Sequence, residues 1–177
     1  AVSAAEQSHI GVLLRHPLRR NGTPVGLGDL IAEALRAIVR ADFAVQNTGG
    51  VRADLPAGDL TFGQVFQVLP FDNRVTILIL TGQQLRAMIK HMHARKGEVP
   101  YVAGLAVSRE DRSIHSADGA ALDDAKLYRV ATNDFLADGG DGLDAVFKDV
   151  PTERRTDTDY DMREALIELL RERYPAR

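Results

Sequence analysis

Residues 131–143, with the sequence ATNDFLADGGDGL, place a bulky aromatic ring next to carboxylates and a very flexible backbone. Phe135 is followed by Asp138 and Asp141, which stand among three glycines. Metal loops, phosphate loops, tight turns and ligand platforms all use such residues. No nearby histidine or third ligand supports a metal, and on spacing alone a turn is the commonest use. The rest of the chain must decide between a turn and a ligand platform.

Two further loops carry similar groups, at residues 47–61 (NTGGVRADLPAGDLT) and 68–85 (VLPFDNRVTILILTGQQL). Arg52 offers a planar cation that suits a phosphate or a stacked ring. Phe71, like Phe135, offers a face on which a nucleobase can stack. Side chains that could fix a ligand's orientation are Asn47, Asn73 and Asp141, and glycines that allow close backbone approach are Gly49, Gly50, Gly139 and Gly140. Gathered at one rim, these groups could hold a flat polar molecule.

Two other patterns suggest metal chemistry but fail on spacing. His91 and His93 are two residues apart on a predicted helix, so their side chains point about 200° apart. The segment DTDYDMREALIE (157–168) resembles a calcium loop, but Met162 stands where that loop needs a glycine. We interpret its aspartates as residues that favour the start of a helix. The chain contains neither a GxSxG nor a GxxxxGK[ST] motif.

Composition limits the possible classes of protein. The 177 residues are 45% hydrophobic and carry a net charge of −3, which fits one globular domain and argues against a general nucleic-acid binder. The lack of cysteine excludes disulfides, thiolate metal sites and cysteine nucleophiles. We expect no membrane span, because no apolar run approaches ~20 residues, and no signal peptide at the start.

The hydrophobic periodicity predicts mixed helices and strands. A helix is expected over 27–38 and another near the end, with an apolar stripe from Met162 to Leu170. Capping-box patterns predict two more, which begin at Thr61 and Thr81. Expected strands cover 42–47, 73–81, 101–108 and 126–133, with a polar hairpin or loop between the last two. Because strands and helices do not alternate strictly, we predict an α+β or layered α/β domain with a mixed sheet.

Taken together, the loops resemble the C-terminal, substrate-binding domain of the family of 5'-nucleotidases, UDP-sugar hydrolases and 2',3'-cyclic phosphodiesterases. The resemblance runs from about Ile10 to Leu170. It rests on the segments NTGGVR (47–52), LPF (69–71), NDFLADGGDG (133–142) and TPVGLGDLIAEALR (23–36). It implies a single α+β domain over residues 1–177, of the layered α/β/β/α type with mixed sheets.

The resemblance also implies residue roles. Phe71 and Phe135 match two aromatic residues that sandwich the nucleobase. Residues expected to bind the rest of the substrate are Asn47, Gly50, Asn73, Gly139 and Asp141, with Arg52 near the phosphate. The family usually has another arginine just before the first helix, but Arg19 and Arg20 are out of step with that pattern, so neither is assigned.

Family enzymes hydrolyse phosphate esters with two metal ions held by an N-terminal metallophosphoesterase domain. Its Asp-x-His and Gly-Asn-His segments do not occur in these residues. The resemblance therefore implies no catalytic residue, metal site or cofactor in this chain, which we expect to be inactive alone. It implies a nucleotide or nucleoside ligand, that N-terminal domain as a partner, and a periplasmic, secreted or cell-surface location. The alternatives are a stand-alone nucleoside- or nucleotide-binding module and a structural domain that has lost its ligand.

Overall fold

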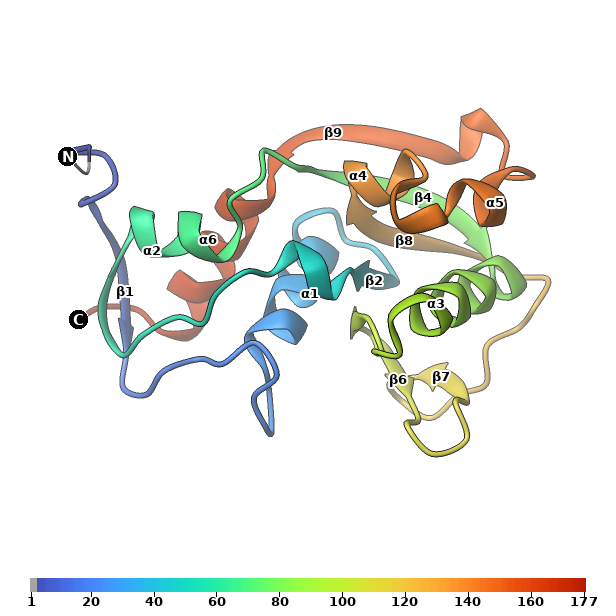
Figure 1. The fold of residues 1–177 in the computed structure, drawn as a ribbon, viewed down its shortest axis with the longest axis horizontal. Coiled ribbons are helices and arrows are strands. Elements are labelled where there is room, and N and C mark those ends of the chain that lie inside the picture. Colours follow the sequence, from blue (N-terminus) through green and yellow to red (C-terminus); the bar gives the residue numbers. More distant parts are fainter. Residues whose placement is uncertain (1–2) are drawn as a thin grey trace.

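The computed structural model describes residues 3–177 and is organised around a five-stranded mixed sheet of order β5-β2-β8-β4-β9 (Figure 1). These strands are β5 (Tyr101–Ala103), β2 (Phe43–Gln46), β8 (Leu127–Asn133), β4 (Arg74–Thr81) and β9 (Arg155–Asp161). β2 runs parallel to β8, whereas β4 pairs antiparallel with both β8 and β9. Two small antiparallel sheets pair β1 (His9–Leu14) with β3 (Gly58–Thr61) and β6 (Leu105–Val107) with β7 (Ile114–Ser116).

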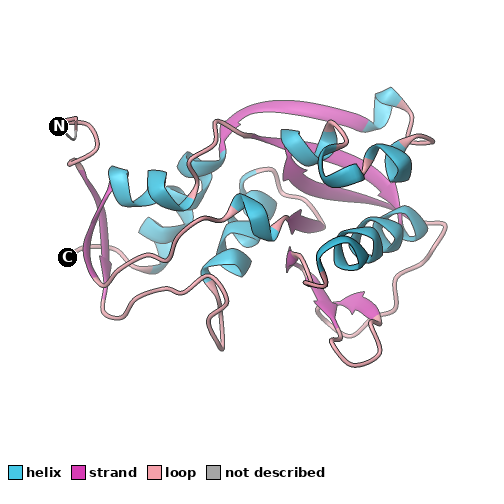
Figure 2. Ribbon diagram, viewed as in Figure 1, coloured by secondary structure: helices cyan, strands magenta, loops and turns pink. Residues whose placement is uncertain are grey.

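Helices pack against both faces of the large sheet (Figure 2). The helices are α1 (Leu27–Ile38), α2 (Phe62–Val68), α3 (Gly82–Lys96), α4 (Asp134–Ala137), α5 (Asp144–Phe147) and α6 (Met162–Arg173), with short 3-10 turns η1 (Thr48–Gly50), η2 (Gly140–Gly142) and η3 (Thr152–Arg154). One core cluster joins α1 and α6 to Ala44 and Ala131, and another joins α3 to Val45 and Val130. Neighbouring strand residues therefore face opposite layers, as in a sheet that is buried on both sides.

The predicted mixed α and β architecture is confirmed, together with the four predicted helices and three of the four predicted strands. The capping box of α3 has both of its bonds: Thr81 N donates to Gln84 Oε1 (2.9 Å), and Gln84 N donates to Thr81 Oγ1 (3.1 Å). The apolar residues on one face of this helix are buried, namely Leu85, Met88, Ile89 and Met92. Local capping and periodicity were therefore reliable guides for these elements.

Two predicted elements need correction. The strand expected over 101–108 is divided into β5 and β6, which lie in different sheets. Gly104 has a φ of +74°, and a Cβ there would lie 2.6 Å from the carbonyl oxygen of Asp42, so the chain turns at this glycine. Residues 157–160, interpreted as the start of a helix, belong to β9, and only Asp161 caps α6 by accepting from Arg163 N (2.7 Å). β9 is polar on both faces and gave no hydrophobic alternation.

A glycine inside α1 allows this helix to pack against β5. A Cβ at Gly28 would lie 2.2–2.4 Å from ring atoms of Tyr101, whose hydroxyl donates to Asn21 Oδ1 (2.7 Å). Alanine favours a helix over glycine by about 1 kcal/mol. We nevertheless expect Gly28→Ala to lower the free energy of unfolding by about 1–3 kcal/mol in urea titrations, because overpacking outweighs helix propensity.

The same substitution in a Tyr101→Ala background provides the control. Without the ring, the three contacts of 2.2–2.4 Å are removed, so Gly28→Ala should be close to neutral or stabilising there. An equal loss in both backgrounds would show that the clash with Tyr101 is not the cause.

Candidate functional site

The strand topology brings the predicted site segments to one edge of the large sheet. Val75, near the start of β4, pairs with Asn133, the last residue of β8. Because β2 is parallel to β8, its last residue, Gln46, points its chain toward the same edge. The loops after β2, before β4 and after β8 therefore leave the sheet together. These are the three loops that the sequence analysis singled out.

Buried amides connect two of these loops. The side-chain nitrogen of Asn133 donates to Gln46 Oε1 and to Asn47 Oδ1, each at 2.9 Å, while its oxygen accepts from Leu136 N (2.9 Å) and caps α4. All three amide residues are less than a tenth exposed. Asn133 and Gln46 were not predicted as site residues, although an amide at the end of a buried strand was a usable signal.

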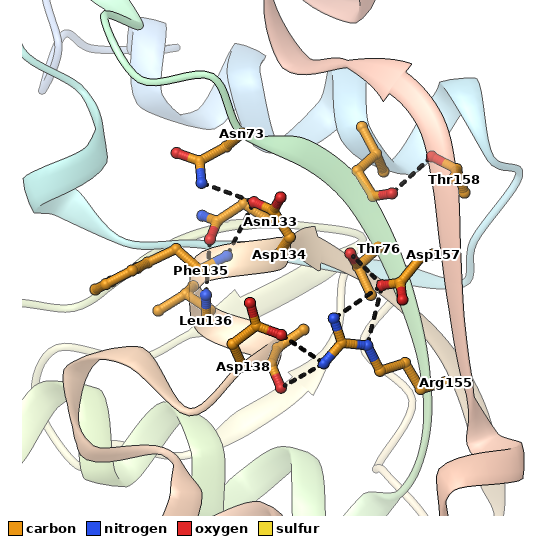
Figure 3. Close-up of polar contacts among 12 residues, drawn as sticks. Asn73, Thr76, Asn133, Asp134, Phe135, Leu136, Asp138, Arg155, Asp157 and Thr158 are labelled. Atoms are coloured by element: carbon orange, nitrogen blue, oxygen red, sulfur yellow. Dashed lines mark hydrogen bonds and ion pairs between the residues drawn. The ribbon is translucent and has the colours of Figure 1, made fainter.

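A second polar contact connects the loops before β4 and after β8 (Figure 3). Asn73 Nδ2 donates to Asp134 Oδ1 at 2.7 Å, and the same oxygen accepts from Phe135 N at 3.0 Å. Asn73 lies two residues after Phe71, and Asp134 immediately precedes Phe135. One carboxylate oxygen therefore links the segments that carry the two aromatic residues.

Both of these phenylalanines are exposed at the rim rather than buried in the core. Phe71 is 51% exposed and Phe135 is 44% exposed, and neither belongs to a core cluster. Phenylalanine is usually buried, so exposure of two rings at one sheet edge is informative. Neither ring is a core residue. Their stacking on a nucleobase stays a prediction.

The glycines after Phe135 shape the turn that carries its ring. A Cβ at Gly140 would lie 2.5 Å from the Phe135 carbonyl oxygen and 2.6 Å from its Cζ atom, so the ring packs over the loop backbone. Gly139 has a φ of +93°, which favours glycine, and a Cβ there would lie 2.8 Å from that of Asp144. Both glycines therefore have a structural reason, and the segment is a turn built around an exposed ring.

Asp141 lies on the side of this rim that faces α3. Its carboxylate is 14% exposed and lies 3.5 Å from Arg95 Nη1, while its carbonyl oxygen is 3.1 Å from His91 Nε2. Asp141 and Asn47 border the same small crevice. The structure therefore brings these two predicted residues together, and Arg95 partly neutralises the carboxylate.

Arg52 extends from the loop after β2 into solvent. Its Nη1 atom lies 3.5 Å from the Gly49 carbonyl oxygen, and among residues 3–177 it forms no ion pair within 4.0 Å. Gly50 lets the loop pack closely, because a Cβ there would lie 2.5 Å from Gln46 Nε2. Arg20, which the sequence left unassigned, donates from Nη1 to the carbonyl oxygen of Val51 at 3.0 Å. Two guanidinium groups therefore lie at this loop.

A larger cavity, of about 970 Å³, lies between α3 and the β6–β7 hairpin. It is bordered by Arg86, Lys90, Arg109 and Arg112, but also by Glu98 and Asp111, and it includes none of the predicted site residues. Arg86 is already bonded to Asp124 (2.9 Å). We therefore place the candidate site at the sheet edge, where the loops that carry the exposed rings, the amides and Arg52 leave the sheet together.

The described residues do not fit the metal pair that the family resemblance implies for the whole enzyme. Within residues 3–177, no group of three or more histidine, aspartate or glutamate side chains is placed to hold a metal ion. His91 contacts the Asp141 backbone instead. No helix in this described range combines the length and apolar character needed to cross a membrane.

Known protein sequences match most of this chain. Residues 6–149 match the sequence model of the family described as 5'-nucleotidase, C-terminal domain. Protein UshA of Escherichia coli (strain K12) is 35% identical over 121 residues, which cover 66% of this chain and 22% of that protein. The trifunctional nucleotide phosphoesterase protein YfkN of Bacillus subtilis (strain 168) is 32% identical over 136 residues, which cover 66% of this chain and 9% of that protein.

Solved structures share the fold. The 5'-nucleotidase precursor from Thermus thermophilus has a TM-score of 0.81 and 29% identity, and the match covers 97% of this chain and 38% of that one. The NAD nucleotidase of Haemophilus influenzae has a TM-score of 0.75 over 96% of this chain and 36% of its own; at 24% identity this likeness concerns the fold alone. The chain spans only part of each protein.

The buried amide of Asn133 yields a test of how the rim is held. We expect Asn133→Ala to lower the free energy of unfolding by about 2–4 kcal/mol, because it removes a helix cap worth ~1 kcal/mol and the 2.9 Å donor to two buried oxygens. Gln46 Oε1 is then unpaired, and Asn47 Oδ1 keeps only the 3.3 Å contact from Gln46 Nε2. Urea unfolding measures this loss. Thr81→Ala, which removes only a cap, should cost about 1 kcal/mol. Equal losses for the two variants would mean that the amide contacts contribute nothing beyond the cap.

Proposed function

The chain belongs to the family of 5'-nucleotidase C-terminal domains, and from this premise we propose that it recognises a nucleotide or nucleoside for a metal-dependent 5'-nucleotidase-type phosphohydrolase. The observation that carries the proposal is the exposure of Phe71 and Phe135 on two loops that one carboxylate oxygen joins. Exposed aromatic faces at the end of rigid strands suit a stacked base better than they suit the stability of the domain.

In this proposal, different residues of the rim bind different parts of the ligand. Phe71 and Phe135 stack on the nucleobase, and stacking tolerates every base. Asn47, Asn73 and Asp141 hydrogen-bond the nucleoside, while Gly50 and Gly139 shape the loops around it. Arg52, in the loop after β2, binds the phosphate, because the planar guanidinium matches phosphate oxygens well. Such a rim would hold the ester in a fixed position for attack.

Hydrolysis itself would belong to another part of the same polypeptide. A metallophosphoesterase domain with a divalent metal pair would activate water there and stabilise the charge on the phosphate. The short span of this chain relative to its relatives supports such an arrangement. We accordingly propose that this chain is inactive alone and that the whole protein works in the periplasm, outside the cell or at its surface. If no such domain accompanies it, the rim would serve a non-catalytic binding module.

Alanine substitutions at the two rings test the base platform. We expect Phe71→Ala and Phe135→Ala each to weaken nucleoside binding by ~1–3 kcal/mol, roughly 5- to 150-fold, because each removes one stacking contact. Their unfolding midpoints should stay close to that of the wild type, whereas a core Phe→Ala change costs about 3–5 kcal/mol. Calorimetric titration with adenosine, guanosine, cytidine and uridine measures the binding.

The matched control is Leu127→Ala. Leu127 is also an exposed apolar residue, but it begins β8 and so lies at the opposite end of that strand from Phe135. This variant should bind nucleosides as the wild type does. The platform is refuted if Phe71→Ala and Phe135→Ala bind nucleosides as tightly as the wild type does, or if they lose as much stability as core variants do.

The role of Arg52 is tested by comparing ligands with and without a phosphate. We expect Arg52→Ala to weaken binding of a nucleoside 5'-monophosphate roughly 10- to 150-fold, the loss of a charged hydrogen bond worth ~1.5–3 kcal/mol. Binding of the matching nucleoside should be unchanged. Arg173→Ala removes an exposed arginine at the end of α6 and serves as the control for net charge. Equal losses for both ligands would contradict the assignment.

A further inference from the structure

Two arginines in the last part of the chain each bind one of the loops that carry the exposed phenylalanines. Arg155 is the first residue of β9, and Arg163 lies in the first turn of α6. Both follow residue 149, where the match to the family model ends. Neither was predicted from the sequence: Arg155 stands in a polar stretch with no recognisable motif, and Arg163 stands in a segment that was interpreted only as the start of a helix.

Arg155 binds the loop of Phe135 (Figure 3). Its Nη1 atom lies 2.7 Å from Asp138 Oδ1 and donates to the carbonyl oxygen of Ala137 at 3.2 Å. Its Nε and Nη2 atoms lie 3.0 and 2.9 Å from Asp157 Oδ1 on β9. This half-buried guanidinium therefore fastens the end of α4, two to three residues after Phe135, to the edge strand of the sheet.

Arg163 binds the loop of Phe71 in a similar way, and it is only 7% exposed. Its Nη1 atom donates to the carbonyl oxygen of Leu69 at 3.2 Å, and its Nη2 atom donates to Asp72 Oδ1 and to Asp161 Oδ2. The two contacts in this loop lie on either side of Phe71. Burial lowers the pKa of Arg163, but its bonds with Asp72 and Asp161 outweigh burial, so the pKa is raised and the group stays charged.

These contacts matter because core packing does not hold the rings. About half the surface of Phe71 and of Phe135 is exposed, so the direction of each ring depends on the backbone on which it stands. A guanidinium can bind several acceptors at fixed angles, which a lysine ammonium cannot do as well. β9 and α6 are continuous through Asp161, which caps α6 and also binds Arg163. A single segment therefore supports both loops.

We propose that Arg155 and Arg163 are positioning residues that set the directions of Phe135 and Phe71 and thereby the affinity for the nucleobase. The proposal rests on the proposed function, because the rings must bind a base for their direction to matter. It adds one residue of β9 and one of α6 to the functional unit. Neither arginine touches the ligand; each acts through one particular ring.

Double-mutant cycles test this pairing with nucleoside titrations at a temperature where every variant is folded. Arg155→Lys and Arg163→Lys keep the charge but lose the fork, and each should weaken binding at least three-fold. Adding Arg155→Lys to Phe135→Ala should cause no further loss, because the ring through which Arg155 acts is gone. Adding Arg155→Lys to Phe71→Ala should weaken binding by the same factor as Arg155→Lys does alone. Arg163→Lys should show the reverse pattern, with no further loss in Phe71→Ala and its full loss in Phe135→Ala. These crossed pairs are the matched controls.

Hydrogen exchange of the free protein reads the positioning without a ligand. Arg155→Lys should speed exchange in residues 134–142 and leave 69–73 unchanged, and Arg163→Lys should do the reverse. The inference is overturned if both lysine variants bind nucleosides and exchange hydrogen as the wild type does, or if the losses are additive in all four pairs. Either outcome would leave the proposed function intact. Failure of the wild type to bind any nucleoside would overturn the proposed function and the effect on affinity, even if exchange showed that the arginines hold the loops.

Discussion

The register between β4 and β8 is the constraint on which the rest of the site depends. Pairing Val75 with Asn133 fixes which residues stand at the sheet edge, and a shift by one residue would turn every side chain of a strand to the opposite layer. The two core clusters resist such a shift, because both faces of these strands are buried. The stability of the core thus determines which polar groups meet at the rim. Site geometry and core packing are consequences of the same pairing.

The rim itself is held by polar contacts. Asn133, Gln46 and Asn47 bury amides that are costly to leave unpaired, so they favour one arrangement of the loops over others. The bond from Asn73 to Asp134 adds a contact between the loops before β4 and after β8. Because these amides are hydrogen-bonded and about half the surface of each aromatic ring is exposed, the rim combines well-held loops with an accessible surface. That combination suits recognition of a flat ligand by a preformed site.

Sequence reasoning worked where one local signal decides the structure. Helical periodicity and capping boxes located α1 and α3, and a run of β-branched and apolar residues located β4. It failed at β9, because a polar edge strand has no hydrophobic alternation, and at Gly104, because the turn depends on the approach of Asp42. At the site, exposed rings and flexible loops could be found from residue types and family resemblance. Asn133 carried a usable signal, an amide at the end of a buried strand, but its role was not predicted. Arg155 and Arg163 could not be found in this way, because their importance lies in partners that are distant in the sequence.

β9 is also an edge strand of the large sheet, and its composition affects how the molecule behaves at high concentration. An edge strand exposes unpaired backbone groups that can join the sheet of a second molecule. Here aspartates stand at every second position from Asp157 to Asp161, and the register with β4 is interrupted between Arg74 and Thr76. Repelling charges and an irregular backbone are two devices by which natural sheets avoid edge-to-edge aggregation. The strand that supports the Phe135 loop is thus also a poor template for β-aggregation.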